Sequence, residues 1–183
     1  MKNWIRSVLV LVALTGVALA PLAEASAALN AYLRLTGQKQ GKINGSVTQK
    51  GHENSIMVIA VSHEIVSPRD PASGLPTGKR QHKPFVITKE LDKSTPILYN
   101  ALVNNENLPN FDLTVLQPGP KGSAPKAYTV RLMNANIASI KALVGEDGKV
   151  IEQVAFTYQK IEWIWADGGI MAMDDWEQPL PKK

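Results

Sequence analysis

The sequence contains no cysteine, only three histidines and few aromatic residues, which make up 6% of the chain. The absence of cysteine excludes disulfide bridges and thiolate–metal sites, so packing and hydrogen bonds must hold the fold together. His52, His63 and His82 are not spaced so that two rings could face one metal ion. We therefore expect structural or surface histidines, no metal site and no cofactor.

After its first residues the chain also lacks an apolar run of the roughly 20 residues needed to cross a bilayer. At the start, Lys2 and Arg6 precede an apolar stretch from Ser7 to Ala20, followed by small residues, as in a secretory signal. A membrane anchor is the alternative interpretation, but the stretch is short for one. We predict a signal peptide over residues 1–25, cleaved after Ala25 or Ala27, and no stable membrane insertion afterwards.

Enzyme motifs are missing as well. There is no Gly-x-Ser-x-Gly elbow, and His63-Glu64 lacks the second histidine of a zinc protease because position 67 is Ser67. The segment Gly74–Lys79 is one residue short of a phosphate-binding loop. We predict that the protein is not an enzyme.

Two acidic clusters are predicted to be neither a catalytic pair nor a metal site. Asp174, Asp175 and Glu177 lie beside Trp176 near the end of the chain, and we expect them to be solvated charges rather than an acid–base pair. The run 146–148 contains too few acids for a calcium site and is predicted to be a turn.

The length of 183 residues is typical of a single domain, which we place at residues 26–183. Loss of Lys2, Arg6 and Glu24 with the signal would lower the formal charge from +4 to +3. Such a mild charge does not indicate nucleic-acid binding.

Alternating apolar and polar residues predict a mainly β fold. The clearest strands contain Phe111 to Val115 and Tyr128 to Leu132, and shorter candidates are Ala31 to Leu35, Ile43 to Thr48 and Pro84 to Lys89. The run from Ser55 to Val66 is apolar at nearly every position and is predicted to be a strand buried on both faces.

The segment Val154 to Trp165 changes the parity of its apolar positions, which predicts a β-bulge near Gln159. Asp167-Gly168-Gly169 then predicts a tight hairpin that returns through Ile170 to Met173. One helix is expected, capped by Ser94 or Thr95 and ending around Asn104 or Asn105.

Two proline-rich stretches, Ser67 to Gln81 and Pro118 to Pro125, are predicted to be surface loops. A loop as long as the first is usually either functional or disordered, and in a protein that assembles with copies of itself it would be a contact arm. We predict that subunit contacts involve Pro68, Arg69, Asp70, Pro71, Leu75, Thr77, Lys79 and Arg80.

The stretch from His82 to Tyr99 reads HKPFVITKELDKSTPILY and resembles the haemolysin-coregulated protein (Hcp) family. The resemblance extends upstream to Gly45-Ser46-Val47 and downstream to the region from Tyr158 to Trp176, so that it covers about residues 29–177. The residues that match the family pattern most clearly are His82, Pro84, Phe85, Lys89, Glu90, Asp92, Ser94, Pro96, Trp163, Asp167, Gly168 and Trp176.

This resemblance implies a compact β-barrel of two curved sheets with one α-helix packed beside it. It also implies hexameric rings that stack into the inner tube of the type VI secretion apparatus, carry effectors, and meet a sheath and a spike. The family has no catalytic residues to transfer.

The predicted signal departs from the family pattern, because tube subunits assemble in the cytoplasm without one. The chain is therefore expected to be secreted, either as a working tube subunit or as an exported paralogue that acts as a periplasmic or surface binding module. A later translation start would instead leave the ordinary tube role.

Overall fold

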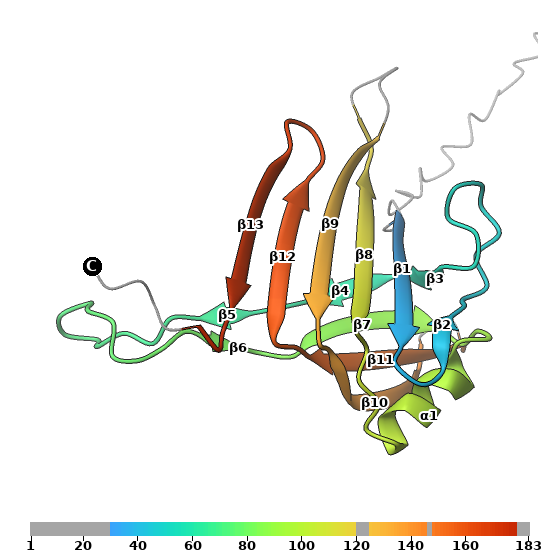
Figure 1. The fold of residues 1–183 in the computed structure, drawn as a ribbon, viewed down its shortest axis with the longest axis horizontal. Helices are drawn as coiled ribbons and strands as arrows, with labels where there is room; N and C mark the ends of the chain where they lie inside the picture. The colour runs from blue at the N-terminus through green and yellow to red at the C-terminus, as the bar shows by residue number, and fades with distance from the viewer. Residues whose placement is uncertain (1–29, 120–124, 146–147, 179–183) are drawn as a thin grey trace, which may run out of the picture.

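The strands of the chain form two main antiparallel sheets, seen in a computed structural model that describes residues 30–119, 125–145 and 148–178. The predicted signal peptide and its cleavage sites lie outside the described residues, as do residues 120–124 of the second proline-rich loop and the acids Glu146 and Asp147. The predicted fold class, mainly β with two curved sheets and one helix beside them, is confirmed (Figure 1).

The larger sheet has seven strands in the order β13-β12-β9-β8-β1-β2, with β3 also paired to β1. Every pairing in it is antiparallel. The strands are β1 (Asn30–Gly37), β2 (Gly41–Ile43), β3 (Ile56–Val58), β8 (Asn110–Gln117), β9 (Lys126–Met133), β12 (Lys160–Trp165) and β13 (Ile170–Asp175).

The smaller sheet has four strands in the order β10-β11-β7-β4. These are β4 (Ala60–Ser62), β7 (Phe85–Glu90), β10 (Asn136–Val144) and β11 (Val150–Thr157). A separate two-stranded ribbon pairs β5 (Ile65–Val66) with β6 (Gln81–His82).

The core lies between the two sheets, where the alternating apolar residues of β1, β7, β8 and β11 meet. Phe111 from the larger sheet contacts Phe85 and Phe156 from the smaller one edge-on, with ring centroids 5.5 and 5.0 Å apart. Edge-on packing is a favoured geometry for aromatic pairs because the positive ring edge meets a negative ring face. The three rings therefore fix the two sheets against each other.

The predicted helix is α1 (Thr95–Val103), which packs beside β10. Pro96 sits in its first turn, Leu98 and Ala101 face the core, and Asn104 forms its C-terminal cap. Ser94 occupies the N-cap position, but its side chain makes no capping hydrogen bond. Within the described part of the chain, no helix is long and apolar enough to cross a membrane.

The prediction for Ser55 to Val66 is wrong in two respects. The segment forms three short strands, β3, β4 and β5, because it passes from the larger sheet to the smaller one and then into the ribbon. Only Ser55, Ile56 and Val58 are buried, whereas Ile59 and Val61 are 39% and 37% exposed. The predicted strand from Ile43 to Thr48 is also wrong beyond Ile43, where β2 ends.

The β-bulge predicted near Gln159 is absent from the described strands, and the parity change has a different cause. Tyr158 and Gln159 link β11 in the smaller sheet to β12 in the larger one, and each sheet has its own inward face. The irregular register lies instead in β10, between Ile137 and Ser139. The hairpin at Asp167-Gly168-Gly169 is confirmed, with φ of 84° at Gly168 and 64° at Gly169.

Candidate subunit interface: the extended arm and its root

Residues 67–81, called the arm below, project from the body of the molecule beyond the ribbon β5–β6 (Figure 1). The predicted contact residues lie along this arm, and most of them are exposed. Leu75, near its tip, is 65% exposed. Pro68, Asp70 and Arg80 are half-buried, while Arg69, Pro71, Thr77 and Lys79 are exposed.

The arm is held in shape by its own hydrogen bonds. Asp70 Oδ1 accepts bonds from the Ser73 backbone at 2.7 Å and the Ser73 hydroxyl at 2.8 Å, and these bonds lower the pKa of Asp70. Thr77 N donates to Pro68 O at 3.0 Å, and Arg69 pairs with Pro76 across the two limbs. The arm is thus an ordered hairpin rather than an open loop.

Five side chains hold the base of the arm and are called the root below: His63, Arg80, His82, Tyr158 and Asp174. The Arg80 guanidinium pairs with the Asp174 carboxylate and also donates to Asp175 O at 2.7 Å. His82 Nε2 lies 2.6 Å from the same carboxylate. These contacts tie the ribbon to β13, at the edge of the larger sheet.

The remaining root contacts form a chain through Tyr158. Its hydroxyl lies 2.9 Å from His82 Nδ1 and 2.6 Å from His63 Nε2. With both rings neutral, His63 Nε2 donates to Tyr158, Tyr158 donates to His82 Nδ1, and His82 Nε2 donates to Asp174, so that each of these three contacts has one donor and one acceptor. A proton added to His82 Nδ1 would break this order, because that nitrogen could no longer accept from Tyr158.

Burial and neighbouring groups shift the pKa values of three groups in the root. Burial lowers the pKa of His63, and the neighbouring His82 lowers it further. Burial alone would raise the pKa of Asp174, but the hydrogen bonds from Arg80 and His82 outweigh it and hold that pKa below its ordinary value. Burial, together with the charge of Asp174, raises the pKa of Tyr158, which therefore stays protonated.

A second polar cluster lies at the start of α1. Lys89 is fully buried, and its Nζ lies 2.9 Å from Glu152 Oε2 and 3.0 Å from Asp92 Oδ1. The Thr95 hydroxyl donates to the same Glu152 oxygen at 2.7 Å, and Ser94 N donates to Asp92 at 3.0 Å. These motif residues join β7, β11 and α1, and their role is structural.

The other motif residues lie apart from one another. Phe85 is in the core, Trp163 is half-buried on the inner face of β12, and Pro84 and Pro96 are exposed at the starts of β7 and α1. Glu90 and Asp167 are exposed and pair with Lys149 at 3.1 Å and Lys126 at 2.8 Å, while Gly168 lies in the hairpin turn and Trp176 is 50% exposed after β13.

The sequence interpretation missed two residues of the root. Asp174 was expected to be a solvated charge, and this is wrong because its side chain is only 24% exposed and pairs with Arg80 and His82. Tyr158 belonged to a recognised motif without a role of its own. The alternation of apolar and polar residues along β11 could have indicated Tyr158, because it places this side chain inward just where the strand ends.

No group of three or more His, Asp or Glu side chains in the described ranges could hold a metal ion. His52 stacks on Tyr32 with ring centroids 4.0 Å apart, and the other two histidines belong to the root. In the described structure, His52 therefore lies in a ring stack and His63 and His82 lie in the hydrogen bonds of the root.

Residues 32–165 match a protein family described as type VI secretion system effector, Hcp. The chain belongs to the Hcp family. Over 166 residues it is 39% identical to the major exported protein of Pseudomonas aeruginosa, covering 82% of this chain and 96% of that one. This match supports the expected role as a tube protein of type VI secretion.

Solved Hcp structures have the same fold. Hcp1 from an E. coli pathovar, solved as a mutant, has a TM-score of 0.73 and 32% identity, covering 81% of this chain and 99% of that one. The secreted protein Hcp3 from P. aeruginosa has a TM-score of 0.67 and 33% identity, with the same two coverages of 81% and 99%.

Proposed function

We propose that this Hcp protein forms six-membered rings that stack into the inner tube of a type VI secretion apparatus, and that it is itself secreted. The observation that carries the proposal is the family match across residues 32–165, together with an arm that is ordered and yet projects from the body. Effectors would be carried in the lumen, and the sheath and the spike would be the other partners.

The arm is the proposed contact between stacked rings. Its hydrogen bonds fix its shape before assembly, so that little conformational entropy is lost on contact. The root fixes its direction, because Arg80 and His82 both bind Asp174 on β13. A hairpin held in a fixed direction can make the same contact with the adjacent ring in every subunit.

Negative-stain microscopy of the purified chain tests the ring. Rings with a hollow centre, and their stacks at higher concentration, are the expected result. A species that stays monomeric at every concentration tested would contradict the proposal. Deletion of Ala72 to Leu75 should shorten stacks while leaving single rings, because it removes only the arm tip.

The predicted signal supports a second candidate, an exported Hcp-like module that binds partners in the periplasm or at the surface. Lys2, Arg6 and the apolar stretch from Ser7 to Ala20 favour it. N-terminal sequencing of the protein from culture supernatant, with and without a working sheath, separates the two candidates. A cleaved chain that appears without the sheath would favour the module, and sheath-dependent release would favour the tube subunit.

A further inference from the structure

The ribbon that carries the arm has two limbs, and both limbs reach the same hydroxyl group. The outgoing limb, residues 63–66, begins with His63, and the returning limb, residues 80–83, contains His82. The Tyr158 hydroxyl lies 2.6 Å from His63 Nε2 and 2.9 Å from His82 Nδ1. The strands β5 and β6 pair with each other over only two residues each. A single tyrosine therefore helps to hold both limbs against the body of the molecule.

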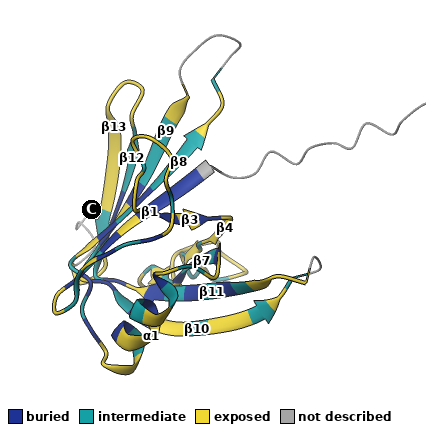
Figure 2. Cartoon of the chain, turned by 90° about the vertical axis from the view of Figure 1, so that its right-hand side faces the viewer, coloured by how far each residue is buried: buried dark blue, intermediate teal, exposed yellow. Residues whose placement is uncertain are grey.

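The returning limb has a second anchor on β13. Arg80 pairs with the Asp174 carboxylate, and His82 Nε2 lies 2.6 Å from the same group. Both contacts reach the half-buried end of β13, a strand whose residues Ile170 to Met173 are exposed (Figure 2). The returning limb would keep its place on β13 even without its contact to Tyr158.

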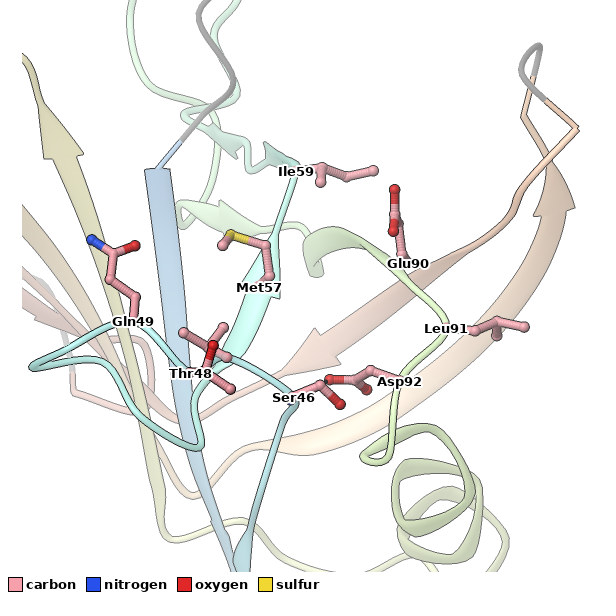
Figure 3. A pocket seen from close by; sticks show the side chains of 9 residues that line it. Ser46, Thr48, Gln49, Met57, Ile59, Glu90, Leu91 and Asp92 are labelled. Carbon is pink, nitrogen blue, oxygen red and sulfur yellow. Dashed lines mark hydrogen bonds between the residues drawn. The ribbon is translucent and has the colours of Figure 1, made fainter.

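The outgoing limb depends on His63 alone. The segment before it is fixed, because Ile59, at the groove shown in Figure 3, donates from its backbone N to Thr88 O at 2.8 Å, and β4 is paired with β7 as far as Ser62. From there to the end of β5, the hydrogen bonds of the described chain run only to the returning limb, apart from the bond between His63 and Tyr158. Loss of this bond would free the outgoing limb just after β4.

The surroundings of His63 contain no anion. The ring faces a recess of about 300 Å³ between the two sheets, which is lined by Val61 of β4, Phe85 of β7, Leu113 and Val115 of β8, Tyr128 and Val130 of β9, and Trp163 of β12. Tyr128 is the only other titratable residue in this lining, and burial raises its pKa, so it stays neutral. The adjacent Glu64 is exposed to solvent. A positive charge on His63 would therefore lie in an apolar setting.

His82 is placed differently. Its side chain is only 5% exposed and faces Asp174 of β13 and the hydroxyl of Tyr158. Arg80 shares the Asp174 carboxylate and also binds the backbone oxygen of Asp175. A proton on Nδ1 would make His82 a cation next to an anion, which favours the charged form.

The root can take up a first proton by reversing its hydrogen bonds. A proton that arrives at His63 Nδ1 lets His63 Nε2 pass its own proton to Tyr158, which passes its hydroxyl proton to His82 Nδ1. His82 then donates to Tyr158, and Tyr158 donates to His63 Nε2. Each contact still has one donor and one acceptor, and the added charge rests on His82 beside Asp174.

A second proton has no such solution. Both rings would then donate to the Tyr158 oxygen, and the hydroxyl proton of Tyr158 would have no acceptor within the root. Two cations would flank one hydroxyl, and His63 would be the cation without an anion beside it. A buried charge without a partner is unfavourable, so His63 should move out into solvent.

We propose that the root is a proton-operated latch, which stays closed when the first proton is taken up and releases the outgoing limb of the ribbon when the second is taken up. The returning limb stays bound to Asp174, so the arm changes direction while both sheets keep their structure. Burial, and then the charge of His82, lowers the pKa of His63 from its ordinary value of 6.5, so the second proton is taken up only below that pH. The latch is a property of the single chain and does not depend on the proposed ring.

Nuclear magnetic resonance of the histidine rings counts the protons in the wild-type chain. We expect two separate steps in the root as pH falls, because interacting groups titrate in steps that belong to the pair. The signals of His63 and His82 should both move in the first step, since the reversal changes both rings. His52, which stacks on Tyr32 outside the root, should follow a single step. Independent single steps at His63 and His82 would show that no latch exists.

Hydrogen exchange measured by mass spectrometry at pH 7.5 and pH 4.5 tests the release. After correction for the direct effect of pH on exchange, amides of residues 63–66 should exchange at least about fivefold faster at the lower pH, because a freed segment loses its protection. Amides of β8 and β9 should keep theirs. Unchanged protection of residues 63–66 after the second step, or equal loss in β8 and β9, would overturn the proposal.

The variant His63→Gln separates the latch from general effects of acid. Glutamine keeps an N–H donor for Tyr158 but takes up no proton in this range, so residues 63–66 should stay protected at pH 4.5. His52→Gln is the matched control, since it removes a histidine outside the root and should open like the wild type. Any effect of pH on assembly is common to both variants. Equal opening in the two variants would refute the latch, and if His63→Gln does not fold, the wild-type titration still decides.

Discussion

Lys89 and Glu152 form an ion pair that is closed off from solvent, with Nζ and Oε2 2.9 Å apart and side chains exposed by 0% and 1%. The pair joins the end of β7 to the start of β11 beside the start of α1, and Asp92 and Thr95 complete its hydrogen bonds. A buried pair need not contribute net stability, but removal of one partner leaves the other charge without compensation.

We predict that Lys89→Met lowers the free energy of unfolding by about 3–5 kcal/mol, because the Glu152 carboxylate remains buried. Urea unfolding followed by circular dichroism measures this. Lys126→Met is the control, since its pair with Asp167 has a similar length of 2.8 Å but side chains that are 44% and 59% exposed. That exposed pair should contribute at most about 1 kcal/mol. The prediction fails if the two variants lose equal stability.

Gly45 lies against the backbone of the segment that precedes β3. A Cβ added there would lie 2.2 Å from Ser55 O and 2.5 Å from Ile56 Cα. We predict that Gly45→Ala lowers the free energy of unfolding by about 1–3 kcal/mol, because the neighbouring backbone must move to admit the methyl group. Gly78→Ala should change stability little, since a Cβ at Gly78 meets nothing within 4 Å. Thermal unfolding of both variants provides the comparison.

The root makes stability depend on pH. The pKa of His63 is lowered in the folded chain from an ordinary value of 6.5. The folded state therefore binds fewer protons than the unfolded state as pH falls below 6.5. The contribution of neutral His63 to the free energy of unfolding is complete above that pH and is lost progressively below it. Unfolding at pH 7.5 and pH 5.5 should show a smaller difference for His63→Phe than for the wild type. An unchanged difference would count against His63 as the titrating group.

Release of the root should free the arm without unfolding the sheets. Asp174→Asn removes the charge that binds both Arg80 and His82, and we expect trypsin to cleave after Arg69 and Lys79 several-fold faster. Fast local opening raises the rate of cleavage at nearby sites even where global stability is kept. Asp112→Asn is the control, because it disrupts an exposed ion pair with Arg131 that includes no residue of the arm or the root. This variant should leave the cleavage rate unchanged.

Much of the fold could be predicted because local patterns agree with it. Alternation placed β8 and β9, the Ser94-Thr95-Pro96 start placed α1, and the glycines after Asp167 placed the β12–β13 hairpin. These elements depend on residues close in sequence, so local patterns predict them even when the strands with which they pair are not known.

Two of the wrong predictions failed because they depended on contacts between residues far apart in the sequence. The parity change at Tyr158 is compatible with a bulge or with passage between sheets, and only the pairing of β11 and β12 distinguishes them. Asp174 likewise reads as a terminal acid until the fold brings Arg80 and His82, more than 90 residues earlier, beside it. Such contacts are long-range and leave no local pattern.

Tyr158 stands in the two-residue link between the sheets and also holds the root of the arm through His63 and His82. A pull applied to the arm would act through Arg80 and His82 on the outer strand β13, and through Tyr158 on the link between the two sheets. Load on the arm would thus be divided between an outer strand and the point where the two sheets meet, which would suit a subunit of the proposed stacked tube.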